Sequence, residues 1–415
     1  MRQALPFALL LLLLPASLLA EGDWPQFRGP GGTGISQATG LPTTWNDETN
    51  VVWKTAIHDK GWSSPVVLGK QVWLTTALVD GKAQWAVCID RETGKVVYDI
   101  KVFDTPKPPY FFLPDANSHA SPSPVIEKGR VYVHFGSAGT ACLDTDSGKL
   151  LWTRTDLKCN HFRAPGSSPI LWQDLLILTF DGHDKQYVTA LAKATGKTVW
   201  ETPRSIDYQT TNGDAKKGYS TPTVIDVDGK PQLVSPAAMG TVAYDPRTGK
   251  ELWKVIHGGM NAASPPQFAH GKVFVTIGAG SKLVAVRPTG MGDVTKSHVD
   301  FIYTKEAPSR PAPIVSGDLL FMLNDSGIVT CLDARTGDLI KKTRVTGSYS
   351  ASPVLADGHL YCFDHEGKGV VLTGDRDLKL VATNNLPAGT RSTPAIVGKS
   401  LFVRTYTHLY RIERR

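Results

Sequence analysis

Residues that could carry chemistry are present in this chain, but none of them forms a complete cofactor motif. The stretch from Gly29 to Gly34 matches G-x-G-x-x-G, yet no strand pattern precedes it and no helix pattern follows, so the dinucleotide-binding context is missing. We interpret it as a flexible loop leading into the fold. The run from Asp144 to Gly148 resembles the start of a calcium loop, but its twelfth position is Thr155, where a bidentate glutamate is needed.

Other catalytic and metal-binding signatures are absent from the sequence. There is no Cys-x-x-Cys-His for haem, no His-Glu-x-x-His for zinc and no Gly-x-Ser-x-Gly for a nucleophilic serine. The eleven histidines show no ligand spacing. We therefore assign no catalytic residue and no metal ligand. The sequence leaves open whether the protein is an enzyme and favours a protein that is not one.

The strands that would position any functional site recur along the sequence as a repeated unit. A small residue followed by proline opens a short apolar strand eight times, and the prolines lie 59, 45, 53, 44, 47, 40 and 41 residues apart. A period near 47 residues is typical of propellers and solenoids. The eight openings are Ser64-Pro65, Ser123-Pro124, Ser168-Pro169, Thr221-Pro222, Pro265-Pro266, Ala312-Pro313, Ser352-Pro353 and Thr393-Pro394.

Each repeat reads as four short strands joined by glycine-containing turns. In the second repeat we expect strands over 124–126, 131–135, 140–144 and 150–153, the last of which carries Trp152. Tyr98, Trp200 and Trp253 take the same place in other repeats, where a large aromatic side chain would dock one blade on the next. This organisation predicts an all-β, eight-bladed β-propeller with four antiparallel strands per blade.

The last repeat contains only three strand patterns, near 395–397, 401–405 and 409–412, before the chain ends. The missing fourth strand is available at the other end, where residues 50–54 read as a strand with Trp53 in the docking position. We therefore expect this N-terminal strand to join the C-terminal blade and close the ring, which would remove two exposed sheet edges.

The N-terminus predicts a signal peptide over residues 1–20, with Arg2 before an apolar run and Ala20 before Glu21. No cysteine follows the run directly and no later segment could span a bilayer. We expect a periplasmic or secreted protein without a lipid anchor or a transmembrane segment. The domains would be an extension over 21–50, packed on one face of the propeller through Trp24 and Phe27, and the propeller over 51–415.

Charge and cysteines narrow the class of protein further. The net charge is +7, but the basic residues are scattered, so we expect no nucleic-acid partner. Cys88, Cys142 and Cys331 share one repeat position, which other repeats fill with alanine, so we expect buried small side chains. Cys159 falls in a loop and Cys362 in a strand, and a disulfide between them stays open. We expect a monomer.

Candidate binding residues lie in the connections between repeats, because variable loops on a rigid scaffold usually carry binding sites. Aromatic and arginine side chains there suit contact with a protein or an anion, although a solvated rim is the simpler interpretation. The cluster at Tyr110, Phe111 and Phe112 is the strongest candidate for an interaction patch. The other candidates, of which the first five are expected to ring the mouth of the central channel, are Trp62, Asn261, Arg310, Tyr349, Arg391, His119, Arg163 and Tyr219.

The repeated pattern Ala/Cys-Leu-Asp-x-x-Thr-Gly-Lys-x-x-Trp resembles the quinoprotein-type (PQQ-like) β-propeller repeat, and the resemblance covers residues 51–415. That family includes an outer-membrane barrel-assembly lipoprotein and quinone-dependent alcohol dehydrogenases. The stretch from Asp23 to Pro30 is also similar to a signature of planctomycete-type exported proteins. The resemblance implies that the enzymes of the PQQ-like family hold the quinone against two adjacent cysteines and bind Ca²⁺ through Glu, Asn and Asp side chains. No two cysteines are adjacent in this chain, which disfavours PQQ with Ca²⁺ as a cofactor.

Three functions follow as hypotheses. The first is a non-catalytic propeller that binds a protein partner or a cell-envelope component through its loop face. The second is a periplasmic PQQ-dependent dehydrogenase-like protein, and the third is a carbohydrate- or small-ligand-binding propeller that uses Trp62, Tyr219 and Arg391. A bound chromophore would favour the second and saccharide-dependent thermal stabilisation the third.

Overall fold

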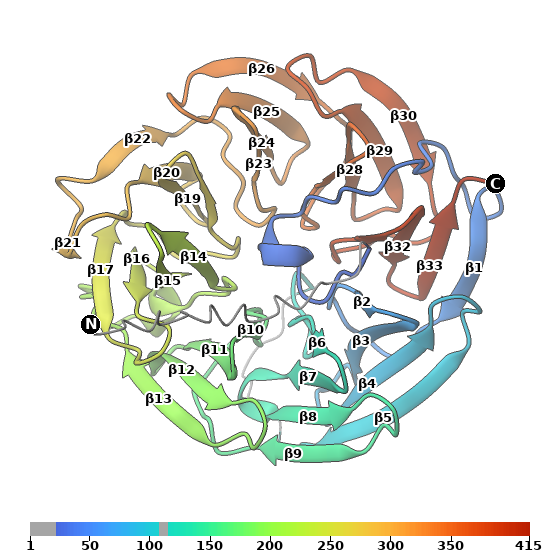
Figure 1. Ribbon diagram of the computed structural model, residues 1–415, viewed down its shortest axis with the longest axis horizontal. Helices are drawn as coiled ribbons and strands as arrows, with labels where there is room; N and C mark the ends of the chain where they lie inside the picture. Colours follow the sequence, from blue (N-terminus) through green and yellow to red (C-terminus); the bar gives the residue numbers. More distant parts are fainter. Residues whose placement is uncertain (1–21, 108–114) are drawn as a thin grey trace, which may run out of the picture.

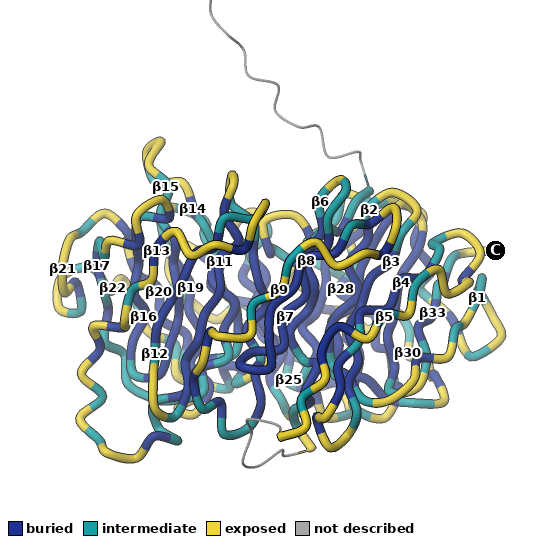
Figure 2. The backbone as a smooth tube through the Cα atoms, turned by 90° about the horizontal axis from the view of Figure 1, so that it is seen from below, coloured by how far each residue is buried: buried dark blue, intermediate teal, exposed yellow. Residues whose placement is uncertain are grey.

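The computed structural model describes residues 22–107 and 115–415. Eight antiparallel sheets surround a central axis like the blades of a propeller, with the inner strands buried and the outer strands exposed (Figures 1 and 2). This confirms the predicted fold. Three 3₁₀ turns are also present, η1 (Pro30–Gly32), η2 (Gly136–Ala138) and η3 (Gly213–Lys216). No helix of the described residues is long and apolar enough to cross a membrane.

The first four blades, each given from the inner strand outward, use residues 66–256. Blade 1 comprises β2 (Val66–Leu68), β3 (Gln71–Ala77), β4 (Ala83–Asp90) and β5 (Val96–Asp104). Blade 2 comprises β6 (Val125–Glu127), β7 (Arg130–His134), β8 (Thr140–Asp144) and β9 (Leu150–Arg154). Blade 3 comprises β10 (Ile170–Trp172), β11 (Leu175–Asp181), β12 (Gln186–Ala192) and β13 (Thr198–Pro203). Blade 4 comprises β14 (Thr223–Val227), β15 (Lys230–Pro236), β16 (Gly240–Tyr244) and β17 (Glu251–Ile256).

The last four blades complete the circle. Blade 5 comprises β18 (Gln267–Ala269), β19 (Lys272–Ile277), β20 (Lys282–Val286) and β22 (Val299–Tyr303). Blade 6 comprises β23 (Ile314–Ser316), β24 (Leu319–Leu323), β25 (Ile328–Asp333) and β26 (Leu339–Arg344). Blade 7 comprises β27 (Val354–Ala356), β28 (His359–Phe363), β29 (Lys368–Thr373) and β30 (Leu380–Asn385). Blade 8 comprises β31 (Ala395–Val397), β32 (Ser400–Arg404), β33 (His408–Glu413) and β1 (Val51–Ala56).

The ring closes as predicted, because β1 pairs with β33 in an antiparallel register that runs from Val51 opposite Ile412 to Ala56 opposite His408. The first strand of the propeller is thus the outer strand of the last blade (Figure 1). The Trp53 indole crosses to blade 1 and donates a hydrogen bond to the Arg91 carbonyl at 3.0 Å.

Blades dock on one another through a large aromatic side chain and a glycine. Trp53, Trp152 and Trp200 each lie over the glycine of the next blade's Thr-Gly-Lys turn, where a Cβ would come within 2.5–2.8 Å of the indole. These glycines also adopt positive φ, which side chains disfavour. Each indole donates to a carbonyl of the same turn at 3.0 Å. The predicted docking role of the aromatic position is therefore confirmed for these three residues.

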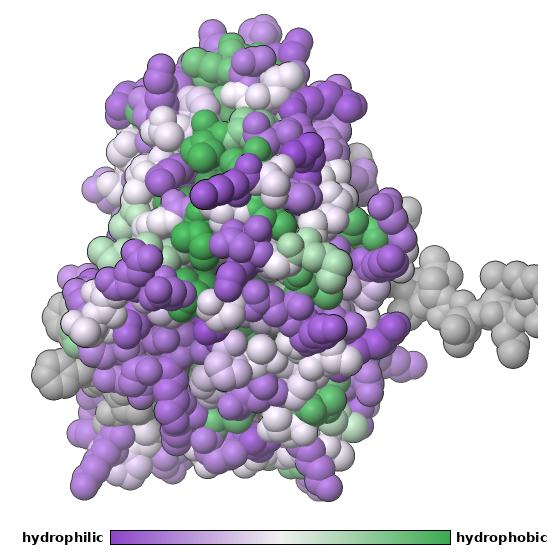
Figure 3. All heavy atoms as spheres, turned by 90° about the vertical axis from the view of Figure 1, so that its left-hand side faces the viewer, coloured by the Kyte–Doolittle hydropathy of each residue, from purple (hydrophilic) through white to green (hydrophobic). Residues whose placement is uncertain are grey.

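Blade 5 departs from the repeat. The connection from β20 to β22 extends outward and its segment β21 (Gly292–Asp293) pairs in parallel with β17 of blade 4, where Val294 is buried. Trp253 accordingly donates to the Gln232 carboxamide of its own blade at 2.7 Å rather than to a turn of blade 5. No pattern in the sequence predicts this fifth strand. Figure 3, which views this side of the rim, shows apolar residues scattered among polar ones.

The cysteines are all free and buried. This confirms the packing role expected for Cys88, Cys142 and Cys331. The disulfide left open between Cys159 and Cys362 is not formed: Cys159 follows blade 2, whereas Cys362 lies in β28 of blade 7.

The N-terminal segment, residues 22–50, lies across the inner strands, and we call it the arm. Trp24 exchanges two backbone hydrogen bonds of 2.8 Å with Val67 in β2, and Pro25 accepts one from Ile126 in β6. After η1, which lies at the centre of the ring (Figure 1), Gly34 accepts from Leu355 in β27. Trp24 is 1% exposed, and the arm therefore ties blades 1, 2 and 7 together across the axis.

Arg28 anchors the arm at the axis. Its guanidinium is fully buried and donates to the carbonyls of Gly32 and Thr33 in the arm, Pro313 before β23 and Pro353 before β27, at 2.8–3.3 Å. No carboxylate of the described residues pairs with it, and burial lowers the pKa of Arg28 to about 9. The glycine-rich stretch is thus a cradle for an arginine, because a Cβ on Gly34 would come within 2.5 Å of its Nη2.

Replacing Gly34 by alanine should destabilise the protein more than the same change at Gly40. Both glycines have φ near +70°, but a Cβ at Gly40 meets nothing within 4 Å. Gly40→Ala should therefore cost only about 1 kcal/mol for the left-handed backbone, and Gly34→Ala roughly 1–3 kcal/mol more because it displaces Arg28. Urea unfolding followed by tryptophan fluorescence measures both. Equal losses would show that Arg28 does not anchor the arm.

Candidate functional site

A cavity of about 250 Å³ lies on the propeller axis, and we call it the axial cavity. Its walls come from the residues just before the inner strands and from the connections between blades, so it opens on the face that carries these connections, which we call the loop face. Phe27 of the arm lines the cavity from the other side. The arm pairs with Val67, Ile126 and Leu355 inside the inner strands, so it closes the channel at the face opposite the loop face.

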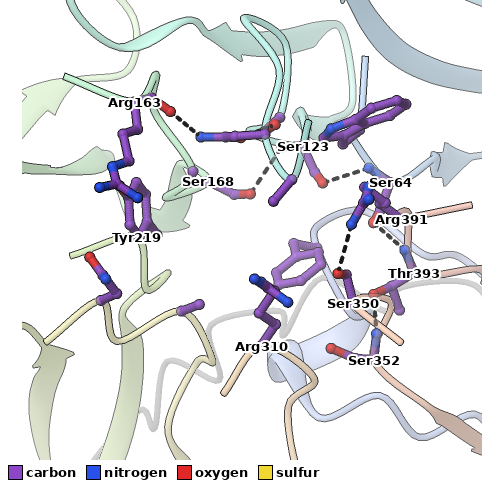
Figure 4. A pocket seen from close by; sticks show the side chains of 18 residues that line it. Ser64, Ser123, Arg163, Ser168, Tyr219, Arg310, Ser350, Ser352, Arg391 and Thr393 are labelled. Atoms are coloured by element: carbon purple, nitrogen blue, oxygen red, sulfur yellow. Dashed lines mark hydrogen bonds between the residues drawn. The ribbon is translucent and has the colours of Figure 1, made fainter. Parts of the chain in front are cut away.

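Hydroxyl groups form a belt around this cavity. Six of the eight inner strands start with a Ser/Thr-Pro pair. The backbone N–H of the residue before the proline donates to the side-chain oxygen of the Ser or Thr in the next blade (Figure 4). Six bonds of 2.8–3.0 Å follow this rule. They run from Ser64 to Ser123, from Ser123 to Ser168, from Ser168 to Thr221, from Ala312 to Ser352, from Ser352 to Thr393 and from Thr393 back to Ser64.

The belt is interrupted between blades 4 and 6, because Pro265 offers neither an N–H nor a hydroxyl. The preceding serines replace it there. Ser220 Oγ donates to the Ser264 carbonyl at 2.6 Å, and Ser264 Oγ donates to the Pro311 carbonyl at 3.1 Å. Every blade is therefore bonded to its neighbour at the axis, directly or through these serines.

Three arginines reach the cavity from the loop face (Figure 4). Arg163 pairs with Asp214 at 2.8 Å and Arg310 with Asp325 at 3.1 Å. Arg391 has no carboxylate partner among the described residues; it donates to Ser350 Oγ at 3.3 Å and to the His365 imidazole at 3.1 Å. No aspartate or glutamate is among the described residues that line the cavity.

The positive charge of these arginines also affects the protonation of His365. Burial and the neighbouring Arg391 and Arg310 lower the pKa of His365 to about 4, so the imidazole is neutral at pH 7 and its Nε2 accepts from Arg391. A neutral histidine leaves the positive charge of Arg391 uncompensated. The histidine thus orients the guanidinium beside the cavity without reducing its charge.

Aromatic side chains form part of the wall. Trp62 packs against Tyr406 with ring centroids 5.0 Å apart. Tyr219 accepts a hydrogen bond from the buried Lys217 ammonium at 3.0 Å, and burial raises the pKa of Tyr219. Asn261 lines the cavity with a left-handed backbone, at φ 58°. These rings give the cavity an apolar wall beside its cationic one.

The structure brings together six of the residues that the sequence singled out: Trp62, Arg163, Tyr219, Asn261, Arg310 and Arg391 all line the axial cavity. The expected position of Tyr349 is wrong, because its ring is 0% exposed in the core between blades 6 and 7 and its hydroxyl donates to the Thr346 carbonyl. His119 is also buried, against Gly81. The cluster at residues 110–112 lies outside the described residues.

Sequence reasoning missed the belt itself. The serines and threonines of the Ser/Thr-Pro pairs were interpreted only as strand openings, although their recurrence before six of the eight inner strands could have indicated an axial role. It also missed Asn117, whose amide nitrogen donates to the Arg163 carbonyl at 2.7 Å and holds that loop at the cavity.

The fold and the cavity define an eight-bladed propeller with a one-ended, cationic cavity on its axis. A family profile described as outer membrane protein assembly factor BamB matches residues 43–235 and 238–415. The chain therefore belongs to this family of PQQ-like propeller repeat proteins.

Individual relatives are distant. The outer membrane protein assembly factor BamB of Legionella pneumophila is 23% identical over 241 residues, which are 58% of this chain and 48% of that protein. This match therefore spans about half the length of the curated relative. The crystal structure of BamB from Moraxella catarrhalis covers 87% of this chain and 99% of its own, with a TM-score of 0.62 and 12% identity.

The fold is shared with enzymes too. A quinohemoprotein alcohol dehydrogenase from Comamonas testosteroni covers 96% of this chain and 81% of its own, with a TM-score of 0.68 and 12% identity. At this identity the likeness shows the fold alone. The described lining of the axial cavity offers three guanidinium groups and no carboxylate, so it lacks the carboxylate ligands that calcium sites in proteins commonly use.

Removing one hydroxyl of the belt should destabilise the whole ring. Ser123→Ala leaves the buried N–H of Ser64 without its acceptor, and such a loss costs about 1–3 kcal/mol. Ser147→Ala, in an exposed turn of the same blade, should change the free energy of unfolding by less than about 0.5 kcal/mol. Urea unfolding of the two variants measures the difference. A neutral Ser123→Ala would mean that the belt does not hold the blades.

Proposed function

We propose that this protein is a non-catalytic, exported propeller that binds a protein partner, or another component of the cell envelope, through its loop face. Membership of a family described by an outer membrane assembly factor supports a protein-binding role. We extend that role to this chain as a monomer without a cofactor, working in the periplasm or outside the cell after removal of residues 1–20.

The proposal rests on a difference between the two ends of the channel. Arginine and aromatic side chains converge around a hollow on the loop face, where Arg163, Arg310 and Arg391 surround Trp62 and Tyr219. Arg, Tyr and Trp are the residues most enriched at the energetic centres of protein interfaces. The opposite end of the channel is closed by the arm, so the hollow is accessible from the loop face.

The rigidity of the wall supports binding. The arginines extend from loops whose ends are held by the hydroxyl belt, and the three guanidinium groups are oriented by Asp214, Asp325 and His365. Oriented side chains lose less conformational entropy when a partner binds. No cluster of potential metal ligands is found among the described residues, and no carboxylate lines the described part of the cavity wall.

A photo-crosslinking residue placed on the loop face should capture the partner in living cells. Arg310→p-benzoylphenylalanine should yield one discrete adduct after irradiation, and mass spectrometry would identify the attached protein. Arg376→p-benzoylphenylalanine is the matched control, because Arg376 is an exposed arginine in an outer turn of the opposite face. Equal adducts at both positions, or none at position 310, would contradict the proposal.

Export is tested separately. The mature protein should be recovered from the periplasm or the medium with Glu21 as its first residue, because the predicted cleavage follows Ala20. N-terminal sequencing of the native protein measures this. Recovery of an uncleaved chain from the cytoplasm would remove the exported part of the proposal.

A further inference from the structure

The polar atoms at the base of the axial cavity are mostly hydrogen-bond donors. The hydroxyl oxygens of the belt each accept a backbone N–H from the neighbouring blade. A hydroxyl also carries one O–H donor, and none of these donates to another group in the described residues. Five belt residues line the cavity and are 2–3% exposed: Ser64, Ser123, Ser168, Ser352 and Thr393.

Two further polar atoms of the wall, Trp62 Nε1 and Asn261 Oδ1, are buried without a partner in the described part of the chain. Because neither atom is accessible from the cavity, neither can contact a ligand in it.

Positive charge accumulates around the same axis. Beside the three arginines of the wall, Arg28 and Arg404 are 0% and 2% exposed and donate only to carbonyl and hydroxyl oxygens of the described residues. Arg404 contacts Ser63, the neighbour of the belt residue Ser64. An uncompensated buried cation is costly, and an anion in the axial cavity would offset this cost.

The walls indicate what kind of anion fits. Phe27, Trp62 and Tyr219 give the cavity apolar surfaces, so an anion with a carbon skeleton should bind more tightly than a bare inorganic ion. A volume of about 250 Å³ lies just below the usual 300–1,000 Å³ of small-molecule sites. The guanidinium group of an arginine can donate two parallel hydrogen bonds to the two oxygens of a carboxylate. The donors, charge and walls together fit a small carbon skeleton that carries carboxylates.

We propose that the axial cavity is a binding site for an organic carboxylate, which Arg391 holds by charge with Arg310 beside it, while the belt hydroxyls donate hydrogen bonds to it. The carboxylate has two sources, a free small acid or an acidic side chain or C-terminus of a bound protein. The site does not require the protein-binding role, and it would persist if the loop face bound no protein.

Isothermal titration calorimetry of the purified mature protein tests the site with citrate as the probe. Citrate should bind at one site per chain, with an affinity that falls as sodium chloride is raised, because screening weakens the contact with the arginines. Trimethyl citrate, which keeps the shape and loses the charge, should show no binding. Sodium phosphate should bind at least 10-fold more weakly than citrate.

Variants locate the site. Arg391→Ala and Arg310→Ala should each weaken citrate at least 10-fold, whereas Arg376→Ala, the exposed arginine of the opposite face, should leave the affinity unchanged. Arg391→Lys keeps the charge and should retain part of the affinity. Circular dichroism during heating verifies that each variant is folded, so that a loss of binding reports the site.

The outcomes separate the two sources. Binding of citrate but not of the peptide Gly-Asp-Glu-Glu supports a free acid, and binding of the peptide but not of citrate supports a carboxylate of a partner protein. No heat from either probe at 10 mM, a phosphate affinity equal to that of citrate, or equal losses in Arg391→Ala and Arg376→Ala would overturn the proposal. Crosslinking from position 310 tests the protein-binding role and not this site, because the substitution itself removes the Arg310 side chain.

Discussion

The structure depends on the hydrogen-bond belt that links neighbouring blades at the axis. The inner strands converge there, and six of the residues at their starts leave a backbone N–H that no strand pairs. The hydroxyl of the next blade's Ser or Thr accepts it at 2.8–3.0 Å, while the proline that follows has no N–H to satisfy. The Ser/Thr-Pro repeat is therefore a solution to one constraint, the pairing of buried backbone groups.

The same belt creates the cavity. Small hydroxyl residues leave space on the axis that larger side chains would fill, and the arm closes that space at one end through Arg28 and Phe27. What remains is bordered by three arginines from the connections between blades. Architecture and candidate function thus share an origin, because the residues that hold the blades together also supply the donors of the site.

Local signals explain how much of the fold could be predicted. Glycine turns, Ser/Thr-Pro openings and docking tryptophans are short patterns that recur, and they predicted eight blades and the closure of β1 on β33. The contacts of Arg28 with carbonyls 285 and 325 residues away leave no local pattern. The parallel pairing of β21 and the burial of Tyr349 were missed for the same reason: both depend on which surfaces meet after folding. Of the site, the arginines and aromatics were found and the hydroxyl donors were not.

A crystal soaked in sodium bromide tests most directly whether the axial cavity is a cationic, donor-lined site. Bromide scatters anomalously, so its position can be located without a model of the ligand. The account predicts a bromide peak on the axis, within hydrogen-bonding distance of the Ser123 and Ser168 hydroxyls and near Arg391. A cavity that holds only water, or that binds a cation when soaked in rubidium chloride, would contradict it.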